Sequence, residues 1–218
     1  MKMEIKTLQV AGFEAAIKGM RNPLDSWSRL DSYTDEAGNF VFGANDLKLA
    51  QTLVKAGTEH GKFMRQIHVW ADMDMPRYWW SEFDTYSHNT KNSCSTIHKL
   101  MNKQKPIRLE QFTYEPEDEA FLMTVINKLN EIREQWLVAE TTTEKNALMR
   151  RAKQLLPEGF LQLRTVSTNY AELRNIYFQR RQHRLKPEWQ DTFVEWLKTL
   201  PYAEELIMIE TPKKKEDN

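Results

Sequence analysis

The segment from Glu117 to Glu140 has the clearest helical periodicity in the chain and constrains its fold more than any other stretch. Its apolar side chains recur every three or four residues and form one stripe, made of Phe121, Leu122, Val125, Ile126, Leu129, Ile132, Trp136 and Leu137. Such a stripe packs against other apolar surface, either in the core or in an interface. A second helix follows a polar break at residues 140–144, so residues 117–156 are predicted to form a helical segment.

Strand patterns are few and short. Side chains from Phe63 to Asp72 alternate between two faces, which is the period of a β-strand. A second short strand is indicated by the apolar residues Ile5, Leu8 and Val10. With so few strands among many helices, the sequence predicts a helix-rich α+β fold in which helices flank a mixed or antiparallel sheet.

Further helices are predicted from their apolar spacing and their capping residues. Residues 13–20 are predicted to be helical, and Asp46 is predicted to cap a helix that ends near residue 57. Asp74 is predicted to cap the next helix. Ser167 or Thr168 is predicted to cap another one near the C-terminal end.

Charge and cysteine content narrow the class of protein. Lys plus Arg and Asp plus Glu both total 31, so the formal net charge of zero argues against a protein that coats nucleic acid. Cys94 is the single cysteine, which excludes an intrachain disulfide and a thiolate metal cluster. No apolar run approaches the roughly 20 residues of a membrane span, and the N-terminus lacks the apolar core of a signal peptide. We therefore expect a cytoplasmic protein with no membrane partner.

The length of 218 residues predicts a single domain over residues 1–218, with a disordered, charged tail at about residues 211–218. The five histidines form no i, i+4 pair beside a glutamate, so a zinc protease and other metal sites are not expected. No glycine-rich phosphate loop is present either, which excludes the common Rossmann and P-loop nucleotide sites.

The stretch PRYWWSEFDTYSHNTKNSCS, residues 76–95, places aromatic residues beside small polar ones. A nucleotide needs a flat apolar face for its base and fixed N–H donors or cations for its phosphate. The polar tail of this stretch is therefore a candidate nucleotide loop. Trp79 and Trp80, on the preceding helix, are instead expected to pack in the core.

The densest basic region comprises Arg174, Arg180, Arg181, His183, Arg184 and Lys186. One interpretation is a solvated helix end, where cations complement the partial negative charge of the helix C-terminus. The other is a phosphate clamp made by Arg180 and Arg184, which would share one helix face.

The order of these pieces resembles the flavin-dependent thymidylate synthases, the ThyX family, from about Asp46 to Pro201. The family element G-H-x-S-x-x-E-H is replaced here by E-H-G-K-F-M-R-Q, in which His60 matches the first histidine. The family signature R-H-R-x-x-S-x-N-x-x-S aligns with TYSHNTKNSCS, where Asn92 and Ser95 match. The Arg-His-Arg triplet is replaced by the neutral residues 85–87, Thr-Tyr-Ser.

The C-terminal half resembles the family more closely. AKQLLP, residues 152–157, resembles A-R-x-x-L-P and places Lys153 where the family has a nucleotide-binding arginine. Asn169 and Asn175 fall on asparagines of the flavin site, and Arg180 falls on a phosphate-binding arginine, whereas Ala171 replaces an arginine. These departures indicate a divergent branch of the family, such as one of phage type.

The resemblance implies an enzyme that methylates dUMP to dTMP in nucleotide biosynthesis, using FAD with NADPH and methylenetetrahydrofolate as co-substrates. It also implies a homotetramer with sites between subunits and no sequence-specific nucleic-acid partner. Because the Arg-His-Arg triplet is lost, the alternative is a non-catalytic protein of the same fold that binds a nucleotide or acts as a sensor.

The resemblance implies three groups of site residues. The catalytic residues are expected to be Ser95 and Glu82, the latter standing where the family has a glutamine near the pyrimidine. The residues expected to bind the nucleotide are Asn92, Ser93, Ser95, Lys153 and Arg180. Those expected to bind the flavin are His60, Tyr86, His88, Asn169, Asn175 and Arg184.

Overall fold

The structure is a computed structural model that describes residues 3–211 and divides into two compact units. The first unit contains residues 3–4, 72–85 and 91–165, and the second unit contains residues 5–71, 86–90 and 166–211. The single domain expected over residues 1–218 stays a prediction. The tail expected at residues 211–218 lies outside the described residues, except for Thr211.

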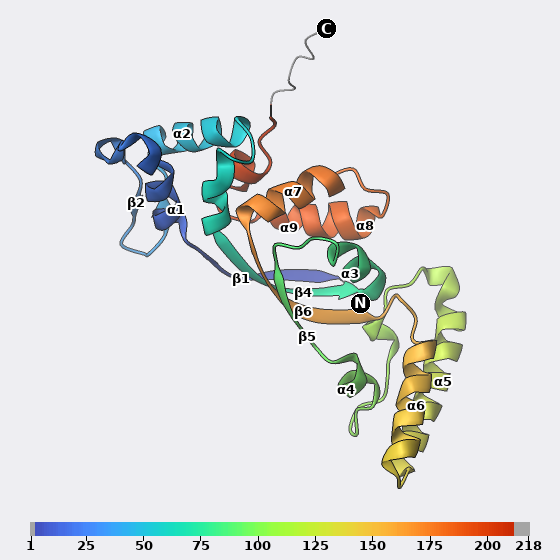
Figure 1. The fold of residues 1–218 in the computed structure, drawn as a ribbon. Helices are drawn as coiled ribbons and strands as arrows, with labels where there is room; N and C mark the ends of the chain where they lie inside the picture. Colours follow the sequence, from blue (N-terminus) through green and yellow to red (C-terminus); the bar gives the residue numbers. More distant parts are fainter. Residues whose placement is uncertain (1–2, 212–218) are drawn as a thin grey trace. The chain divides into compact units, whose positions relative to one another are not determined.

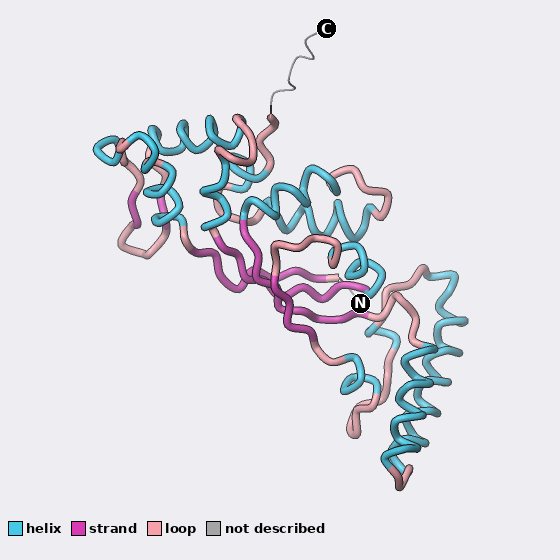
Figure 2. The backbone as a smooth tube through the Cα atoms, viewed as in Figure 1, coloured by secondary structure: helices cyan, strands magenta, loops and turns pink. Residues whose placement is uncertain are grey.

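Four strands form the main sheet in the order β1–β4–β6–β5 (Figures 1 and 2). They span β1 Glu4–Ala11, β4 His68–Pro76, β5 Thr90–Ser93 and β6 Leu161–Asn169. The sheet is antiparallel and is flanked by helices, which confirms the predicted fold class. A separate antiparallel pair joins β2, Tyr33–Thr34, to β3, Phe40–Val41. The sequence predicted β1 and part of β4 but not β6.

Helices account for most of the remaining described residues. The α-helices are α1 Phe13–Met20, α2 Ala44–Lys55, α3 Arg77–Phe83, α4 Thr96–Leu100, α5 Glu119–Val138, α6 Thr142–Leu155, α7 Tyr170–Arg180, α8 Lys186–Glu188 and α9 Glu195–Lys198. Shorter helical turns include the 3₁₀-helix η3, Gly61–Gln66, and the π-helices η6, Trp189–Val194, and η7, Ala203–Ile207. The helices predicted at residues 13–20 and within residues 117–156 are confirmed.

Only part of the strand predicted from Phe63 to Asp72 is correct. From His68 onward, buried and partly exposed residues alternate along β4, as a strand requires. Before it, η3 takes up the first residues of the predicted strand. Gly61 and Met64 are both buried there, because a 3₁₀-helix repeats every three residues and places them on one side.

The start of α2 is capped from a distant segment. The carboxylate of Asp31 accepts hydrogen bonds from the backbone N–H groups of Asn45 at 2.9 Å and Asp46 at 3.0 Å. Asp46, the predicted cap, lies instead in the first turn of α2, and its carboxylate accepts from the backbone N–H groups of Asp31 and Ser32. The Asp31 segment also excludes any side chain at Gly43, because a Cβ atom there would lie 2.1 Å from the Asp31 carboxyl carbon.

The predicted cap of α3 is also misplaced. Asp74 lies inside β4, whose alternating burial continues as far as Met75, and α3 begins directly after Pro76. Trp79 and Trp80 are almost completely buried, which confirms that they belong to the core. The indole Nε1 of Trp80 donates a hydrogen bond to the backbone carbonyl of Gln162 at 2.8 Å, so this ring also links α3 to β6.

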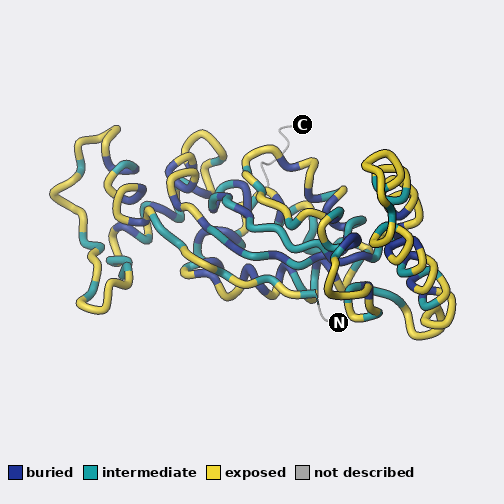
Figure 3. Tube along the Cα trace, turned by 90° about the horizontal axis from the view of Figure 1, so that it is seen from below, coloured by how far each residue is buried: buried dark blue, intermediate teal, exposed yellow. Residues whose placement is uncertain are grey.

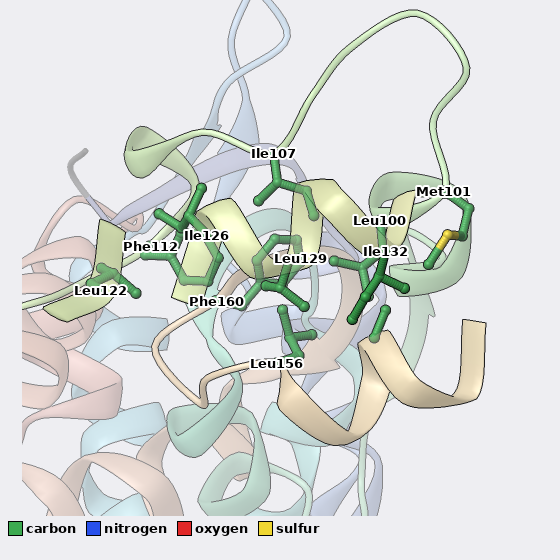
Figure 4. Packing of buried hydrophobic residues seen from close by; sticks show 11 residues of the cluster. Leu100, Met101, Ile107, Phe112, Leu122, Ile126, Leu129, Ile132, Leu156 and Phe160 are labelled. Carbon is green, nitrogen blue, oxygen red and sulfur yellow. The ribbon is translucent and has the colours of Figure 1, made fainter. Parts of the chain in front are cut away.

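Helices α5 and α6 pack against each other and contribute to an apolar cluster of the first unit (Figure 4). Its buried members are Leu100, Met101, Ile107, Phe112, Leu122, Ile126, Leu129, Ile132, Ala152, Leu156 and Phe160. Phe121, predicted to lie in the stripe, is 73% exposed. Neighbouring residues on a helix point about 100° apart, and here Leu122 is buried while Phe121 points away from the cluster. The outer faces of both helices are exposed in Figure 3.

Aromatic rings form the corresponding core in the second unit. Phe13 of α1 stacks on Phe40 of β3 with ring centroids 5.1 Å apart, and meets Tyr170 of α7 edge to face at 5.5 Å. Tyr202 packs edge to face on Phe42 at 4.8 Å. The buried Tyr170 hydroxyl donates to the backbone carbonyl of residue 201 at 2.6 Å, so the start of α7 is anchored by both packing and a hydrogen bond.

The N-terminus of α6 carries a capping box that is expected to stabilise the first unit. The Thr141 hydroxyl accepts from the backbone N–H of Glu144 at 3.2 Å, and the Glu144 carboxylate accepts from the backbone N–H of Thr141 at 3.1 Å. We expect Thr141→Ala to lower the free energy of unfolding by about 1 kcal/mol, measured by urea denaturation. Thr143→Ala, within the helix, is the control. Equal losses in the two variants would contradict the capping role.

Candidate functional site

The predicted nucleotide loop lies in the first unit. Asn92 and Ser93 are exposed residues of β5, and Ser95 follows them as the cap of α4. The Ser95 hydroxyl accepts a hydrogen bond from the backbone N–H of His98 at 3.4 Å. A hydroxyl that accepts in this way still has its own proton to donate. The three polar side chains are therefore accessible, and Ser95 keeps a donor for a ligand.

The other two predicted residues of the first unit come from different helices. Glu82 lies near the end of α3 and is half-buried, whereas Lys153 lies in the last turn of α6 and is exposed. Among the described residues, no hydrogen bond or ion pair joins Lys153 to the loop of residues 90–95. Their joint role in binding a nucleotide stays a prediction.

An ion-pair cluster that the sequence did not reveal holds the start of the predicted loop. Arg164 Nη1 lies 2.9 Å from one carboxylate oxygen of Asp84 and 3.0 Å from the other, and Lys91 Nζ lies 3.0 Å from the first. Burial would raise the pKa of Asp84, but hydrogen bonds from Lys91 and Arg164 outweigh it and lower that pKa. The Arg164 guanidinium also lies 4.2 Å from the centre of the Trp80 ring. Recognising β6 in the sequence would have placed Arg164 beside this loop.

The second unit contains a cavity of about 370 Å³, a volume within the usual range for small-molecule sites. We call it the α7 cavity. Its lining residues come from the end of α2, the turn into η3, the start of α7 and the C-terminal segment, and they are Val54, Gly57, Thr58, Gly61, Met64, Arg65, His88, Asn169, Ala171, Glu172, Arg174, Asn175, Phe178 and Thr211. Of the six residues predicted to bind a flavin, His88, Asn169 and Asn175 are thus brought together.

The first turn of α7 fixes one wall of this cavity. Asn169 is the cap of α7, in place of the predicted Ser167 or Thr168, and its side-chain oxygen accepts from the backbone N–H of Glu172 at 3.0 Å. The carboxylate of Glu172 is nearly buried and lies 3.6 Å from the His88 imidazole, which is largely exposed. A protonated His88 would therefore form an ion pair with Glu172 at the cavity wall.

Arg174 builds a second wall and was not assigned to the site from the sequence. Its guanidinium donates to the backbone carbonyls of Ile207 at 2.9 Å and Ile209 at 2.6 Å, and to the hydroxyl of Thr211 at 2.9 Å. It also lies 4.6 Å from the centre of the Phe178 ring. Burial lowers the pKa of Arg174 from its usual value. These bonds fasten the C-terminal segment to α7, so Arg174 supports the cavity rather than offering a free cation to it.

Tyr86 and Arg180 meet at the other end of α7. Tyr86 is 6% exposed, and its hydroxyl accepts a hydrogen bond from Arg180 Nε at 2.8 Å. The guanidinium also lies over the ring of Trp189, 4.7 Å from its centre. Arg180 is therefore not fully solvated, as the interpretation of the basic region as a solvated helix end would require. The Tyr86 hydroxyl donates in turn to Gln179 Oε1 at 3.1 Å, and Gln179 Nε2 donates to Asn175 Oδ1 at 2.8 Å.

The phosphate clamp predicted on one helix face does not form as a helical pair. α7 ends at Arg180, and Arg184 lies four residues beyond in an exposed turn. The spacing of four residues places two side chains on one face only where the helix continues. A role for Arg184 in flavin binding stays a prediction.

His60 lies at a different cavity of the same unit, with a volume of about 1300 Å³. This larger cavity is lined by residues of α1, α2 and η3 and by the segment between α1 and α2, including Arg21, Arg29, Lys48 and Lys62. Arg65 lines both cavities, so η3 separates them. Of the residues predicted to bind a flavin, His60 thus lies at this larger cavity and His88, Asn169 and Asn175 lie at the α7 cavity, whereas Tyr86 and Arg184 line neither.

Comparison with known proteins identifies the fold. No protein-family model matches the chain, and no curated protein matches its sequence. Among solved structures, the fold is that of the ThyX thymidylate synthases. Thymidylate synthase X from Helicobacter pylori, crystallised with FAD and dUMP, aligns with 94% of this chain and 97% of its own, at a TM-score of 0.69 and 17% sequence identity. A second structure of that enzyme with FAD and dUMP gives a TM-score of 0.68, also at 17% identity, and is 98% covered.

Within residues 3–211, no helix is long and apolar enough to cross a membrane. In the same residues, no group of three or more His, Cys, Asp or Glu side chains is arranged to hold a metal ion.

Proposed function

We propose that this protein binds a flavin and a pyrimidine nucleotide and methylates the nucleotide, most simply dUMP to dTMP. The observation that carries the proposal is the ThyX-like fold over 94% of the chain, combined with a cavity on α7 that gathers His88, Asn169 and Asn175. The Helicobacter pylori enzyme of the same fold was crystallised with FAD and dUMP. NADPH, methylenetetrahydrofolate, a homotetramer, a cytoplasmic location and a phage-type origin are finer parts of the same proposal.

The donor set of the α7 cavity fits part of a flavin. Side-chain amides of Asn169 and Asn175 and the hydroxyl of Thr58 can pair with ring carbonyls or ring nitrogens, and Val54, Met64 and Phe178 add apolar surface. Arg65, which reaches both cavities, is suited to the anionic part of a dinucleotide. When bound, a reduced flavin supplies a hydride, so the protein needs no nucleophile of its own.

The nucleotide would be held by neutral donors and by two cations. Asn92, Ser93 and Ser95 offer exposed amide and hydroxyl groups, while Lys153 and Arg180 carry the charges that a phosphate needs. In this proposal Ser95 donates its hydroxyl proton to a pyrimidine carbonyl, and Glu82 accepts from a ring N–H. Both groups orient and polarise the ring for the transfer.

Ligand uptake tests the proposal directly. We expect the purified protein to be yellow or to take up added FAD, and to bind dUMP in calorimetric titrations. Lys153→Ala should weaken dUMP binding about tenfold, the effect of losing one charge-assisted hydrogen bond. Arg151→Ala, an exposed residue of the same helix, is the matched control. A colourless protein that takes up neither FAD nor dUMP would rule the proposal out.

A second candidate is a nucleotide-binding or sensor protein that has lost catalysis. It is favoured by the contact between Tyr86 and Arg180, because a buried phenol holds the cation that the resemblance assigns to the phosphate. Tyr86 itself stands where the family triplet carries positive charge. Binding of dUMP without any uptake of FAD would support this candidate over the enzyme.

A further inference from the structure

Four side chains of the second unit form a hydrogen-bonded chain that ends at the α7 cavity. Arg180 Nε donates to the Tyr86 hydroxyl at 2.8 Å, Tyr86 donates to Gln179 Oε1 at 3.1 Å, and Gln179 Nε2 donates to Asn175 Oδ1 at 2.8 Å. Gln179 and Asn175 are one helical turn apart on α7, where side-chain amides pair readily. Asn175 is exposed and lines the cavity.

The direction of this chain is set by its arginine. A guanidinium can only donate hydrogen bonds, so the Tyr86 oxygen must accept from Arg180. The phenol then has one proton to give, and Gln179 Oε1 takes it. With its oxygen used in this way, Gln179 turns its amide nitrogen toward Asn175 and meets the oxygen of that side chain. Each amide orientation therefore follows from the one before it.

We propose that this chain makes Asn175 a hydrogen-bond donor toward the α7 cavity, so that the ligand atom it meets is an acceptor. No described residue accepts from Asn175 Nδ2, which leaves both of its protons for a ligand. The group that matches the free Nδ2 protons is a carbonyl oxygen or a phosphate oxygen, whereas a ring N–H could meet only the second lone pair of Oδ1, beside the bond from Gln179. The identity of the ligand in this inference rests on the proposed function. The direction of the hydrogen bond that Asn175 makes with that ligand depends on the protein alone.

Tyr86 is the positioning residue in this arrangement. It is nearly buried and stands within the segment that replaces the family Arg-His-Arg triplet. The Tyr86 hydroxyl accepts from Arg180 and donates to Gln179, which fixes the orientation of the Gln179 amide. Through Gln179 it also fixes the orientation of the Asn175 amide, which it does not contact. The loss of the triplet is thus accompanied by a new neutral group that organises the cavity.

A ligand-free experiment tests the direction. The side-chain amide signals of Asn175 and Gln179 are followed in ¹⁵N-correlated NMR spectra and assigned by Asn175→Asp and Gln179→Glu, which remove them. In Gln179→Glu the new carboxylate can only accept, so we expect the Asn175 amide to rotate, donate to it and exchange more slowly with water. If Asn175 already donated to residue 179 in the parent protein, its signal would keep its exchange rate, and the proposed direction would be wrong.

Two variants control this experiment. Tyr86→Phe removes only the hydroxyl, and we expect it to shift the amide signals of both Gln179 and Asn175. Gln182→Glu makes the same charge change just beyond the end of α7, at an exposed residue, and should leave the Asn175 signal unchanged. Unchanged Gln179 and Asn175 signals in Tyr86→Phe would show that the phenol does not position them and would overturn the inference.

Ligand binding supplies a second readout and distinguishes the two acceptor sources. Riboflavin carries ring carbonyls without phosphate, and inorganic pyrophosphate carries phosphate oxygens without a ring. Asn175→Asp should weaken binding of the probe at least tenfold, Tyr86→Phe should weaken it about three- to tenfold, and Gln182→Glu should leave it unchanged. If Asn175→Asp weakens the binding of riboflavin alone, the acceptor is a ring carbonyl. If it weakens the binding of pyrophosphate alone, the acceptor is a phosphate oxygen. Undiminished binding of both probes to Asn175→Asp would overturn the inference.

The inference and the proposed function can fail separately. A parent protein that binds neither FAD, riboflavin nor pyrophosphate contradicts the proposed function, while the NMR spectra still decide which way Asn175 points. A parent protein that binds riboflavin but shows no rotation of Asn175 in Gln179→Glu retains the proposed function and loses the inference.

Discussion

Replacing Asp46 by asparagine is expected to lower the free energy of unfolding by about 3–5 kcal/mol, the usual cost of breaking a buried ion pair. The Asp46 carboxylate has no exposed surface and accepts a hydrogen bond from Arg21 Nε at 2.5 Å, while Arg21 is 3% exposed. Its second oxygen accepts from the backbone N–H groups of Asp31 and Ser32. An amide has only one accepting oxygen, so at residue 46 its NH₂ group would face either Arg21 or the two backbone N–H groups, and the Arg21 charge would be buried without a counter-charge.

Thermal and urea denaturation measure this effect. For a chain of this length the expected loss corresponds to a fall in Tm of roughly 6–20 °C. Glu36→Gln is the matched control, because it also exchanges a carboxylate for an amide in the second unit but at an exposed turn. A fall in Tm of less than about 2 °C for Asp46→Asn, similar to that of Glu36→Gln, would show that the pair does not hold this unit together.

The same pair predicts a pH dependence of defined sign. Burial would raise the pKa of Asp46, but hydrogen bonds from Ser32, Asp31 and Arg21 outweigh it, so the pKa lies below its usual value of 3.8. A carboxyl group with a lowered pKa in the folded state contributes stability above its unfolded pKa and loses it as the pH falls through the folded pKa. Asp46→Asn should therefore differ most from the parent at neutral pH. The difference should shrink as the pH falls below 3.8, and the two proteins should converge only below the folded pKa of Asp46, which lies lower still.

The local parts of the fold could be predicted from the sequence, and the distant contacts could not. Residues 13–20 and the helices within residues 117–156 were correct because their apolar spacing is local information. Asp46 was misjudged as a cap because the true capping carboxylate comes from Asp31, on a segment that reaches α2 only after folding. The β6 strand was missed because it carries polar residues on a partly covered face.

The candidate site follows the same division. His88, Asn169 and Asn175 were chosen by resemblance to a family pattern, and the fold brings them to one cavity. Nothing in the sequence indicates that Tyr86 meets Arg180, since 94 positions separate them. The role of Arg174 could not be predicted either. In the sequence it is one cation of a basic cluster, whereas in the folded protein its guanidinium donates to backbone carbonyls of the C-terminal segment.

Replacing Arg180 by alanine is expected to affect both stability and nucleotide binding. A solvated arginine at a helix end could be removed with almost no change in the melting temperature of the unliganded protein. In the structure, however, Arg180 donates to the nearly buried Tyr86 and stacks on the fully buried Trp189. A hydrogen bond of this kind contributes about 1 kcal/mol and a partly desolvated cation–π contact about 1–2 kcal/mol. We expect a loss of about 2 kcal/mol in the free energy of unfolding.

The effect of Arg180→Ala on binding should exceed its effect on folding. If Arg180 holds the phosphate, losing its charge-assisted hydrogen bonds should cost about 2–4 kcal/mol, which is a thirtyfold or larger weakening of dUMP binding by calorimetry. Arg184→Ala removes an exposed cation of the same basic cluster and should change neither quantity by more than about 0.5 kcal/mol. Measurements are made well below the melting temperature, so that the less stable variant stays folded.

A comparison of the parent protein, Arg180→Ala and Tyr86→Phe separates the structural role of Arg180 from its role in binding. Tyr86→Phe keeps the cation and its contact with Trp189 but removes the oxygen that holds Nε. If Arg180 only supports the fold, Tyr86→Phe and Arg180→Ala should both lose stability while dUMP binds as it does to the parent protein. If Arg180 also binds phosphate, Arg180→Ala should lose dUMP affinity far beyond Tyr86→Phe, because only the alanine variant lacks the charge. Unchanged dUMP affinity in Arg180→Ala would therefore remove Arg180 from the nucleotide site and leave it as the origin of the hydrogen-bonded chain to Asn175.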